Sequence, residues 1–321
     1  MQTVSVPTSQ PTQRSAQFAN IFAYVALALT WGSSFLLMKV SLDSYSPAQV
    51  ALGRIVIGAL TLACLMLLTR RRWRRERWIW GHMTVVGLML CVVPFLLFSW
   101  AGTFLPSGLS SILNATTPIW TAIIAAVAVR SSRPTRGQVA GIILGALGVG
   151  LVMGVWRVFA DPAFLASVPA QVACLAATFC YGIAFTWMDR FVTRRHTYDS
   201  VSIAAVQLTC ASVISLLIAP FIAATPVQFE WVPTLCLIGL GALGTGYAYV
   251  WNTHVLTSWG SLAASSVTYL TPVVGVALGI LILGEHISWH EPVGAFVIIL
   301  SIMLVQKRKL SWRKPAGSYT I

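Results

Sequence analysis

Two stretches of this chain repeat one another, and the repeat constrains the fold more than any other feature. Residues 107–129 and 261–283 align without a gap, and each copy has a proline near its middle, Pro118 or Pro272. Both copies are too apolar and too long for a helix of a soluble protein, yet each contains several small hydroxyl residues. A central proline frees a backbone carbonyl that only neighbouring helices or water can satisfy inside a membrane. The repeat therefore predicts two related membrane units that meet at a polar site, with helices kinked at these prolines.

Composition supports a membrane location for the whole chain. Hydrophobic residues make up 57% of the sequence and charged residues only 9%, which excludes an ordinary soluble domain. A bilayer core of about 30 Å needs about 20 mostly apolar residues per helix. On this measure the sequence predicts an all-α polytopic membrane protein with ten transmembrane helices. They are residues 20–40, 48–69, 79–99, 105–129, 138–156, 168–188, 200–223, 231–252, 259–283 and 292–305.

The net charge of +13 raises the question of a nucleic-acid partner, and the distribution of the charge argues against one. Most basic residues fall on alternate connections between the predicted spans, within residues 70–77, 130–136, 190–195 and 307–314. Cytoplasmic loops of membrane proteins carry such an excess of lysine and arginine. We therefore expect a multi-pass protein of the inner or plasma membrane, with both termini cytoplasmic and with lipid headgroups, not nucleic acid, as partners of the arginines.

The first and sixth spans also match one another. Residues 31–35 read W-G-S-S-F and residues 181–185 read Y-G-I-A-F. Because five spans, an odd number, separate the two, the second copy must enter the membrane in the opposite orientation. Such inverted repeats are typical of secondary transporters, whose site lies between the halves. The predicted units are a disordered cytoplasmic leader (1–19), a first five-helix repeat (20–157), a second five-helix repeat (168–306) and a basic cytoplasmic tail (307–321).

Four motifs, taken in order, resemble the EamA family of the drug/metabolite transporter superfamily. They are W-G-S-S-F in the first span, Arg54 within A-L-G-R-I-V-I-G-A-L in the second, the T-P pairs of the fourth and ninth, and L-G-E-H at residues 283–286. The resemblance covers about residues 20–306. It implies a ten-helix inner-membrane carrier, usually an exporter of amino acids or other small metabolites. Since substrates vary within the family, it implies no particular one.

Several aromatic and amide residues near the middle of the predicted spans are candidates for lining a substrate cavity. Aromatic faces suit apolar or cationic groups, and amides orient a bound solute. The alternative is that these side chains only pack between helices. The predicted substrate-binding residues are Trp31, Asn114, Tyr181, Tyr249, Asn252 and Tyr269, with Trp187 and Trp251 as further candidates.

Arg54 is the one charged residue well inside a predicted span. An ionisable group in the membrane is costly and marks a functional site by default. It lies only about six residues, or roughly 9 Å, past the predicted outer end of its helix, so its side chain also has the reach to anchor at the interface. Two interpretations stay open: a structural anchor or inter-helix bond, and a contact with a substrate carboxylate or a gate.

The residues that are missing limit the mechanism. No acidic residue falls at the centre of a span, and no phosphate-binding G-x-x-x-x-G-K-[ST] loop is present. This pattern favours facilitated diffusion or exchange, or coupling through a peripheral carboxylate such as Glu285. Enzyme motifs, metal-ligand clusters and cofactor signatures are also missing from the sequence, so we predict a transporter and not an enzyme, with no metal or cofactor.

Two further questions stay open at this point. A flippase for a lipid or a lipid-linked carrier is the alternative function on the same fold. It requires a cavity open sideways to lipid and a basic residue at headgroup depth, a position that Arg54 is a candidate to fill.

The small-residue spacings, such as Gly141-x-x-x-Gly145, serve close helix packing within a monomer or in a homodimer.

Overall fold

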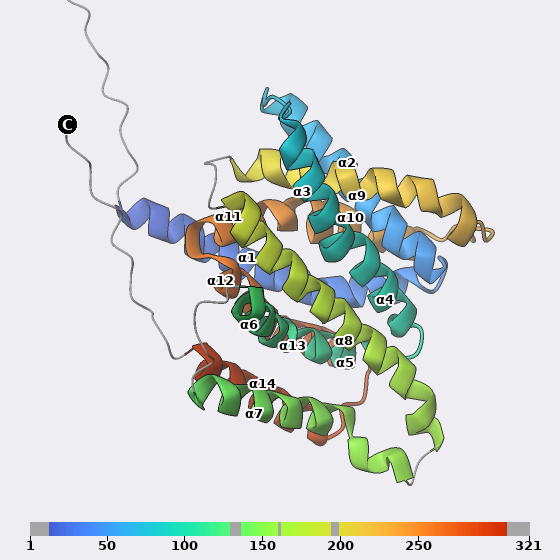
Figure 1. Cartoon of the computed structure of the whole chain (residues 1–321). Helices are drawn as coiled ribbons and strands as arrows, with labels where there is room; N and C mark the ends of the chain where they lie inside the picture. The colour runs from blue at the N-terminus through green and yellow to red at the C-terminus, as the bar shows by residue number, and fades with distance from the viewer. Residues whose placement is uncertain (1–12, 129–135, 160–161, 194–198, 307–321) are drawn as a thin grey trace, which may run out of the picture.

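The computed structural model describes residues 13–128, 136–159, 162–193 and 199–306 (Figure 1). This part of the chain is helical and contains no strand. Eight of its helical stretches are long and apolar enough to cross a membrane. Two shorter apolar helices, Val139–Met153 and His290–Ser301, coincide with the fifth and tenth predicted spans. The all-helical membrane fold is confirmed, and the number of ten crossings stays a prediction. The predicted tail and most of the predicted leader lie outside the described residues.

The first half of the fold contains seven α-helices, two pairs of which together form single spans. A π-helical turn, η1 (Leu88–Val92), joins α3 to α4, and a short turn joins α5 to α6. The helices are α1 (Gln13–Ser41), α2 (Pro47–Leu68), α3 (Arg77–Gly87), α4 (Val93–Gly102), α5 (Ser107–Asn114), α6 (Thr117–Ala128) and α7 (Arg136–Met153).

The second half repeats this plan. A π-helical turn, η4 (Ala242–Tyr247), joins α10 to α11, and a 3-10 turn, η5 (Val267–Tyr269), joins α12 to α13. The helices are α8 (Pro162–Met188), α9 (Ser200–Ile222), α10 (Trp231–Gly241), α11 (Ala248–Trp259), α12 (Ser261–Ser266), α13 (Thr271–Leu283) and α14 (His290–Gln306). A 3-10 turn, η2 (Val155–Phe159), precedes α8, and a π-helical turn, η3 (Asp189–Thr193), follows it.

The fourth and ninth predicted spans are interrupted at equivalent places. Each proline is the second residue of the helix after the interruption, α6 or α13, because its ring has no N–H to continue the preceding helix. Threonine hydroxyls bind the carbonyls that the interruption frees. Thr117 Oγ1 donates to Asn114 O at 2.8 Å, and Thr271 Oγ1 donates to Thr268 O at 2.8 Å.

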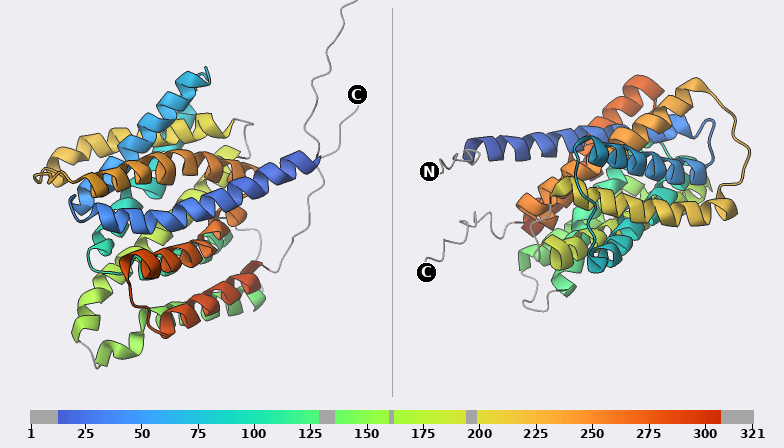
Figure 2. Two further views of the ribbon diagram at one scale, coloured as in Figure 1. Left: turned by 180° about the vertical axis from the view of Figure 1, so that it is seen from behind. Right: turned by 90° about the horizontal axis from the view of Figure 1, so that it is seen from above.

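The two halves pack against one another through matching pairs of helices (Figure 2). The outermost helices α7 and α14 pair side by side, as do α2 and α9. At the centre, α1 packs on α13 and on α10 and α11, while α8 packs on α6 and on α4. Residues 31–38 and 181–188 share one pattern of buried and half-buried positions. The two matching stretches of sequence thus occupy equivalent environments.

The described ends of the chain lie together. The start of α1 and the end of α14 are at the same end of the bundle in all views (Figures 1 and 2). A surface cavity beside the start of α1 is lined by Arg71, so the arginine-rich connection 70–77 belongs to this end too. We call it the basic end, and the other the far end.

Close contact between α8 and α6 depends on Gly182. A Cβ atom at this position would lie 2.8 Å from Trp120 Cβ and 2.9 Å from Thr121 N, where no atom fits without a backbone shift. The equivalent Gly32 stands just as close to α13, with Val274 Cβ 2.5 Å from the position of a Cβ.

We expect Gly182→Ala to lower the free energy of unfolding by about 1–3 kcal/mol, because the added methyl group forces α6 and α8 apart. Thermal unfolding of the purified protein in detergent measures the change. Gly81→Ala is the matched control, since a Cβ at Gly81 meets no atom within 4 Å. Equal midpoints for the two variants would contradict this account of the α6–α8 contact.

Candidate functional site

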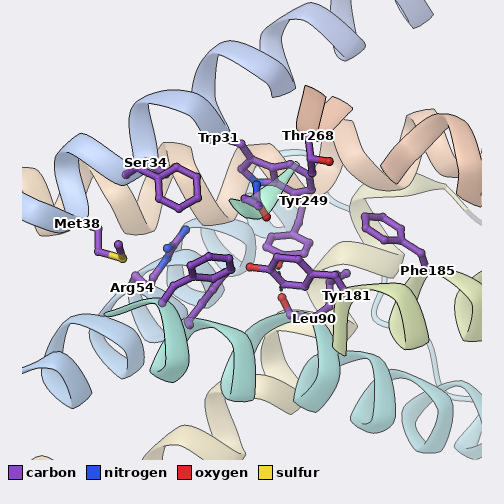
Figure 3. A pocket seen from close by; sticks show the side chains of 13 residues that line it. Trp31, Ser34, Met38, Arg54, Leu90, Tyr181, Phe185, Tyr249 and Thr268 are labelled. Atoms are coloured by element: carbon purple, nitrogen blue, oxygen red, sulfur yellow. Dashed lines mark hydrogen bonds between the residues drawn. The ribbon is translucent and has the colours of Figure 1, made fainter. Parts of the chain in front are cut away.

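A small cavity lies between the two halves at the centre of the bundle (Figure 3). Its space of about 40 Å³ is enough for only a few water molecules, whereas sites for small molecules typically measure about 300–1,000 Å³. The helices around it must therefore separate before a larger solute fits. The lining residues come from α1, α2, η1, α4, α5, α8, α11 and η5: Trp31, Ser34, Phe35, Met38, Arg54, Leu90, Phe95, Phe98, Asn114, Tyr181, Phe185, Tyr249 and Thr268.

Aromatic rings form most of the wall. Trp31 and Tyr249 meet edge to face with ring centroids 6.1 Å apart. On the other side, Phe98 packs edge to face against Phe35 at 5.5 Å and stacks on Tyr181 at 6.0 Å. The Tyr249 hydroxyl donates to Leu90 O at 2.6 Å, as the dashed line in Figure 3 marks. This contact fixes the ring of Tyr249 against the π-helical turn η1.

Arg54 supplies the positive charge of the cavity. Its side chain is only 5% exposed. Nε donates to Thr245 Oγ1 at 3.0 Å and one Nη donates to Gly244 O at 3.5 Å, while the guanidinium carbon lies 3.7 Å from the centre of the Phe95 ring. No acidic side chain in the described part of the chain forms an ion pair with it. The guanidinium is thus held by neutral groups alone and is not neutralised.

The π-helical turn η4 makes the main bond to Arg54 possible. Thr245 lies within this turn, and its hydroxyl also donates to Leu240 O five residues earlier. Gly241 and Gly244 allow the turn to approach α2 and α1, because a Cβ at Gly241 would meet Ile57 and one at Gly244 would meet Ser34. The glycines of the eighth predicted span therefore place a polar hydroxyl against the buried cation.

A second polar contact mirrors this one across the two halves. Gln207 of α9 is fully buried, and its Nε2 lies 3.5 Å from Cys91 Sγ in the π-helical turn η1. Arg54 reaches from the first half to η4 of the second, and Gln207 reaches from the second half to η1 of the first. Two equivalent polar contacts therefore join the halves. Only the contact of Arg54 carries a charge, and only Arg54 lines the cavity.

The structure places the predicted site residues in two groups. Trp31, Arg54, Asn114, Tyr181 and Tyr249 line the cavity. Asn114 Nδ2 also donates to Thr271 Oγ1 at 3.4 Å, which joins the interruption after α5 to the start of α13.

Asn252 and Tyr269 are not among the lining residues. Asn252 is fully buried and neither its amide nitrogen nor its amide oxygen has a hydrogen-bond partner, and the buried hydroxyl of Tyr269 also has none. Of the two further candidates, Trp187 donates from Nε1 to His82 Nδ1 at 3.2 Å, and Trp251 lines a cavity at the basic end.

Several of the residues that line the cavity were not predicted from the sequence. Phe35 and Phe185 occupy matching positions of the repeat, so the alignment of the first and sixth spans contained a signal for them. Phe95 and Phe98 gave no comparable signal, because apolar rings are common on helices that face lipid. Only the packing of α4 against α8 and α2 turns them toward the cavity.

A wider and more open cavity of about 550 Å³ lies at the basic end between α1, α9 and α11. Arg71 and Asp199 on its edge form an ion pair, and Asp199 also accepts from Arg74 at 3.3 Å. Partial burial alone would raise the pKa of the Asp199 carboxyl, but hydrogen bonds from Ser202 and from Arg71 together with the arginine charge lower it. The arginines at this edge therefore share an acidic partner, in contrast to Arg54 in the central cavity.

Comparison with known proteins decides the family. The model of the EamA-like transporter family matches residues 18–154 and, a second time, residues 168–306. This chain belongs to the EamA-like transporter family. Each match covers one half of the fold, so the two halves are two copies of the family's unit, in agreement with the internal repeats.

Relatives of this EamA-like protein match it over most of its length. It is 26% identical to a probable terminal-alkyne amino-acid exporter of Streptantibioticus cattleyicolor, over 93% of this chain and 97% of that protein. It is 23% identical to the uncharacterized transporter YoaV of Bacillus subtilis, over 87% of this chain and 94% of that protein. It is 22% identical to the uncharacterized inner membrane transporter YedA of Escherichia coli K12, over 88% and 89%.

A protein of known crystal structure has the same fold. The superposition gives a TM-score of 0.63 at 17% sequence identity, and it covers 92% of this chain and 98% of the other. Together with the family match, this establishes a multi-pass membrane protein of a transporter family.

We expect Thr245→Val to lower the free energy of unfolding by about 1–3 kcal/mol, because the buried Arg54 Nε loses its acceptor while the shape of the side chain is kept. Thr257→Val is the matched control, since Thr257 Oγ1 donates only to carbonyls of its own helix, Thr253 O and His254 O. Thermal unfolding in detergent compares the two. A Thr245→Val midpoint no lower than that of the control would mean that Arg54 does not depend on this bond.

Proposed function

We propose that this protein is a secondary transporter that exports amino acids or similar small amphipathic metabolites by alternating access. The observation that carries the proposal is the buried guanidinium of Arg54 in a cavity between the halves, where no acidic side chain of the described residues pairs with it. A solute carboxylate in this cavity would supply the missing negative charge and form charge-assisted hydrogen bonds. The relative named as a probable amino-acid exporter supports the same substrate class.

The other groups in the cavity suit the rest of such a solute. The rings of Trp31, Tyr181 and Tyr249 offer faces to an apolar body or to an ammonium group. Asn114 has an amide that orients a polar group through a hydrogen bond. We propose that Asn252 and Tyr269, whose buried polar atoms have no partner in this conformation, contact the solute after the helices have moved.

Alternating access requires two equivalent arrangements of the halves. We infer ten crossings and an inverted repeat, with the first five-helix unit over residues 20–157 and the second over 168–306. The reciprocal contacts of Arg54 and Gln207 with the π-helical turn of the other half support this, since exchange of the two halves preserves them. We propose that the basic end, with both termini, lies on the cytoplasmic side, because cytoplasmic loops carry an excess of arginine and lysine. We propose a monomer or a homodimer without metal or cofactor.

A lipid flippase is the alternative on this fold, and the position of Arg54 argues against it. A flippase needs its basic residue at a lateral opening to the lipid headgroups. Arg54 is only 5% exposed, and its guanidinium is covered by the Phe95 ring. We therefore favour a soluble solute with a carboxylate.

Transport by purified protein in liposomes tests the proposal. We expect saturable transport of apolar or aromatic amino acids, and little transport of the corresponding amines, which lack the carboxylate. Arg54→Gln should lower kcat/KM for the acid about ten- to hundredfold, because a buried charge-assisted hydrogen bond is lost. Asn114→Ala should raise KM for the same acid.

Arg72→Gln is the matched control, since Arg72 is exposed at the basic end and its loss leaves the cavity unchanged. Equal transport of acids and amines by the unmodified protein, or unchanged kinetics in Arg54→Gln, would refute the assigned substrate class. Translocation of labelled lipid without transport of any solute would favour the flippase.

A further inference from the structure

The turn between α4 and α5 at the far end of the bundle is held on one side by a lysine. Lys39, near the end of α1, donates from Nζ to Gly102 O at 2.6 Å and to Leu105 O at 3.1 Å. Both carbonyls belong to the end of α4 and the turn that follows it. A cation at the carbonyl end of a helix is favoured by the helix dipole. Lys39 thus ties the end of α1 to the end of α4.

A glutamate holds the other side of the same turn. Glu285 Oε1 accepts from Ser107 N at 2.6 Å, and Oε2 accepts from Ser107 Oγ at 2.9 Å and from Gly108 N at 3.0 Å. These amides are the free donors at the start of α5, where a carboxylate is favoured. Glu285 comes from the segment after α13, in the other half of the chain, so the contact joins the two halves.

The backbone around Glu285 is shaped for this contact. Gly284 has φ +65° and ends α13 in the left-handed conformation, after which Glu285 N donates to Gly279 O at 3.0 Å. A Cβ at Gly279 would overlap Glu285 Oε2 and would stand 3.0 Å from Ser107 Oγ. The carboxylate therefore lies in a space that only glycine at position 279 leaves open.

The equivalent turn at the basic end is held differently. This turn joins α11 to α12 at Gly260. Nearby, Tyr24 of α1 shares a hydrogen bond of 3.0 Å with Ser266 and packs against Trp259, with ring centroids 5.9 Å apart. Among the described residues, no charged side chain forms a hydrogen bond with residues 259–261. Of the two equivalent turns, only the one at the far end is therefore held by charged side chains of the described residues in this conformation.

We propose that Lys39 and Glu285 are gating residues, a clamp that keeps the transport path closed at the far end until the α4–α5 turn is released. The inference rests on the proposed function. Helices α4 and α5 carry Phe95, Phe98 and Asn114 of the cavity wall, so movement of their common turn opens the cavity toward the far end. Both clamp residues come from elements outside the α4–α5 hairpin, and release of their bonds frees it.

Labelling of a cysteine in the cavity tests the clamp. The reporter is Ser34→Cys on the lining of α1, in the full chain with its six native cysteines replaced by alanine. The protein is reconstituted in liposomes, and a membrane-impermeant maleimide is added on the face that exposes the far end. We expect Lys39→Met, Glu285→Gln and Gly279→Ala each to raise the labelling rate about tenfold or more, because the clamp loses charge-assisted bonds or the space for them.

Two control variants make the result specific. Asp43→Asn removes a charge at the far end that forms no bond to the turn, and should leave the labelling rate unchanged. Lys39→Arg keeps a cation with several donors, and should keep labelling slow. Gel filtration of each variant establishes that it is folded. Gly279→Ala changes no charge, so it tests the clamp even when Glu285→Gln does not fold. Folded clamp variants that label at the rate of the parent would overturn the proposal.

The labelling needs no substrate, which separates this proposal from the proposed function. Faster labelling in a protein that transports no solute would support the clamp and refute the transport proposal. Normal transport together with unchanged labelling would refute the clamp alone.

Discussion

The structure depends on the burial of the Arg54 guanidinium, which has no acidic partner among the described residues. A charged side chain inside a membrane protein is costly unless polar groups or a counter-charge compensate it. Arg54 receives one hydroxyl, one carbonyl and one aromatic face. To supply the first two, the eighth predicted span unwinds into the glycine-rich π-helical turn η4. The glycine-rich turn η4 thus supplies the polar groups that hold the guanidinium, which forms no ion pair within the described part of the chain.

Duplication of the five-helix unit explains why two equivalent polar contacts join the halves, of which one carries a charge. Gln207 meets the π-helical turn η1 as Arg54 meets η4, but its amide is neutral. Under the proposed function, a solute with a carboxylate has one preferred direction in the cavity, with its acid group toward Arg54 of α2. The same reasoning applies at the ends of the bundle, where the far-end turn is held by charges and the basic-end turn by Tyr24. The two copies share a backbone plan and differ in the side chains that set the energy of each conformation.

The sequence was sufficient for the helical membrane fold and for the two copies, because apolar length and repeated motifs carry that information locally. It also identified Arg54, since a lone charge in an apolar span stands out. Two predicted contacts, Asn252 and Tyr269, fall outside the cavity, because depth in the membrane does not fix the direction in which a helix turns its side chains. The contacts of Glu285 with the start of α5 could not be predicted from the sequence, for a different reason. Its partners at Ser107 and Gly108 are far away in sequence, and only packing of α13 on α5 brings them together.

Ligand-induced stabilisation of the purified protein tests the unpaired charge of Arg54 most directly. A ligand that binds only the folded protein raises its unfolding temperature in proportion to the logarithm of its concentration over Kd. We predict that an apolar amino acid raises the midpoint of the unmodified protein, that the corresponding amine does not, and that Arg54→Gln abolishes the difference between the two. Equal stabilisation by acid and amine, or a difference that persists in Arg54→Gln, would contradict the account.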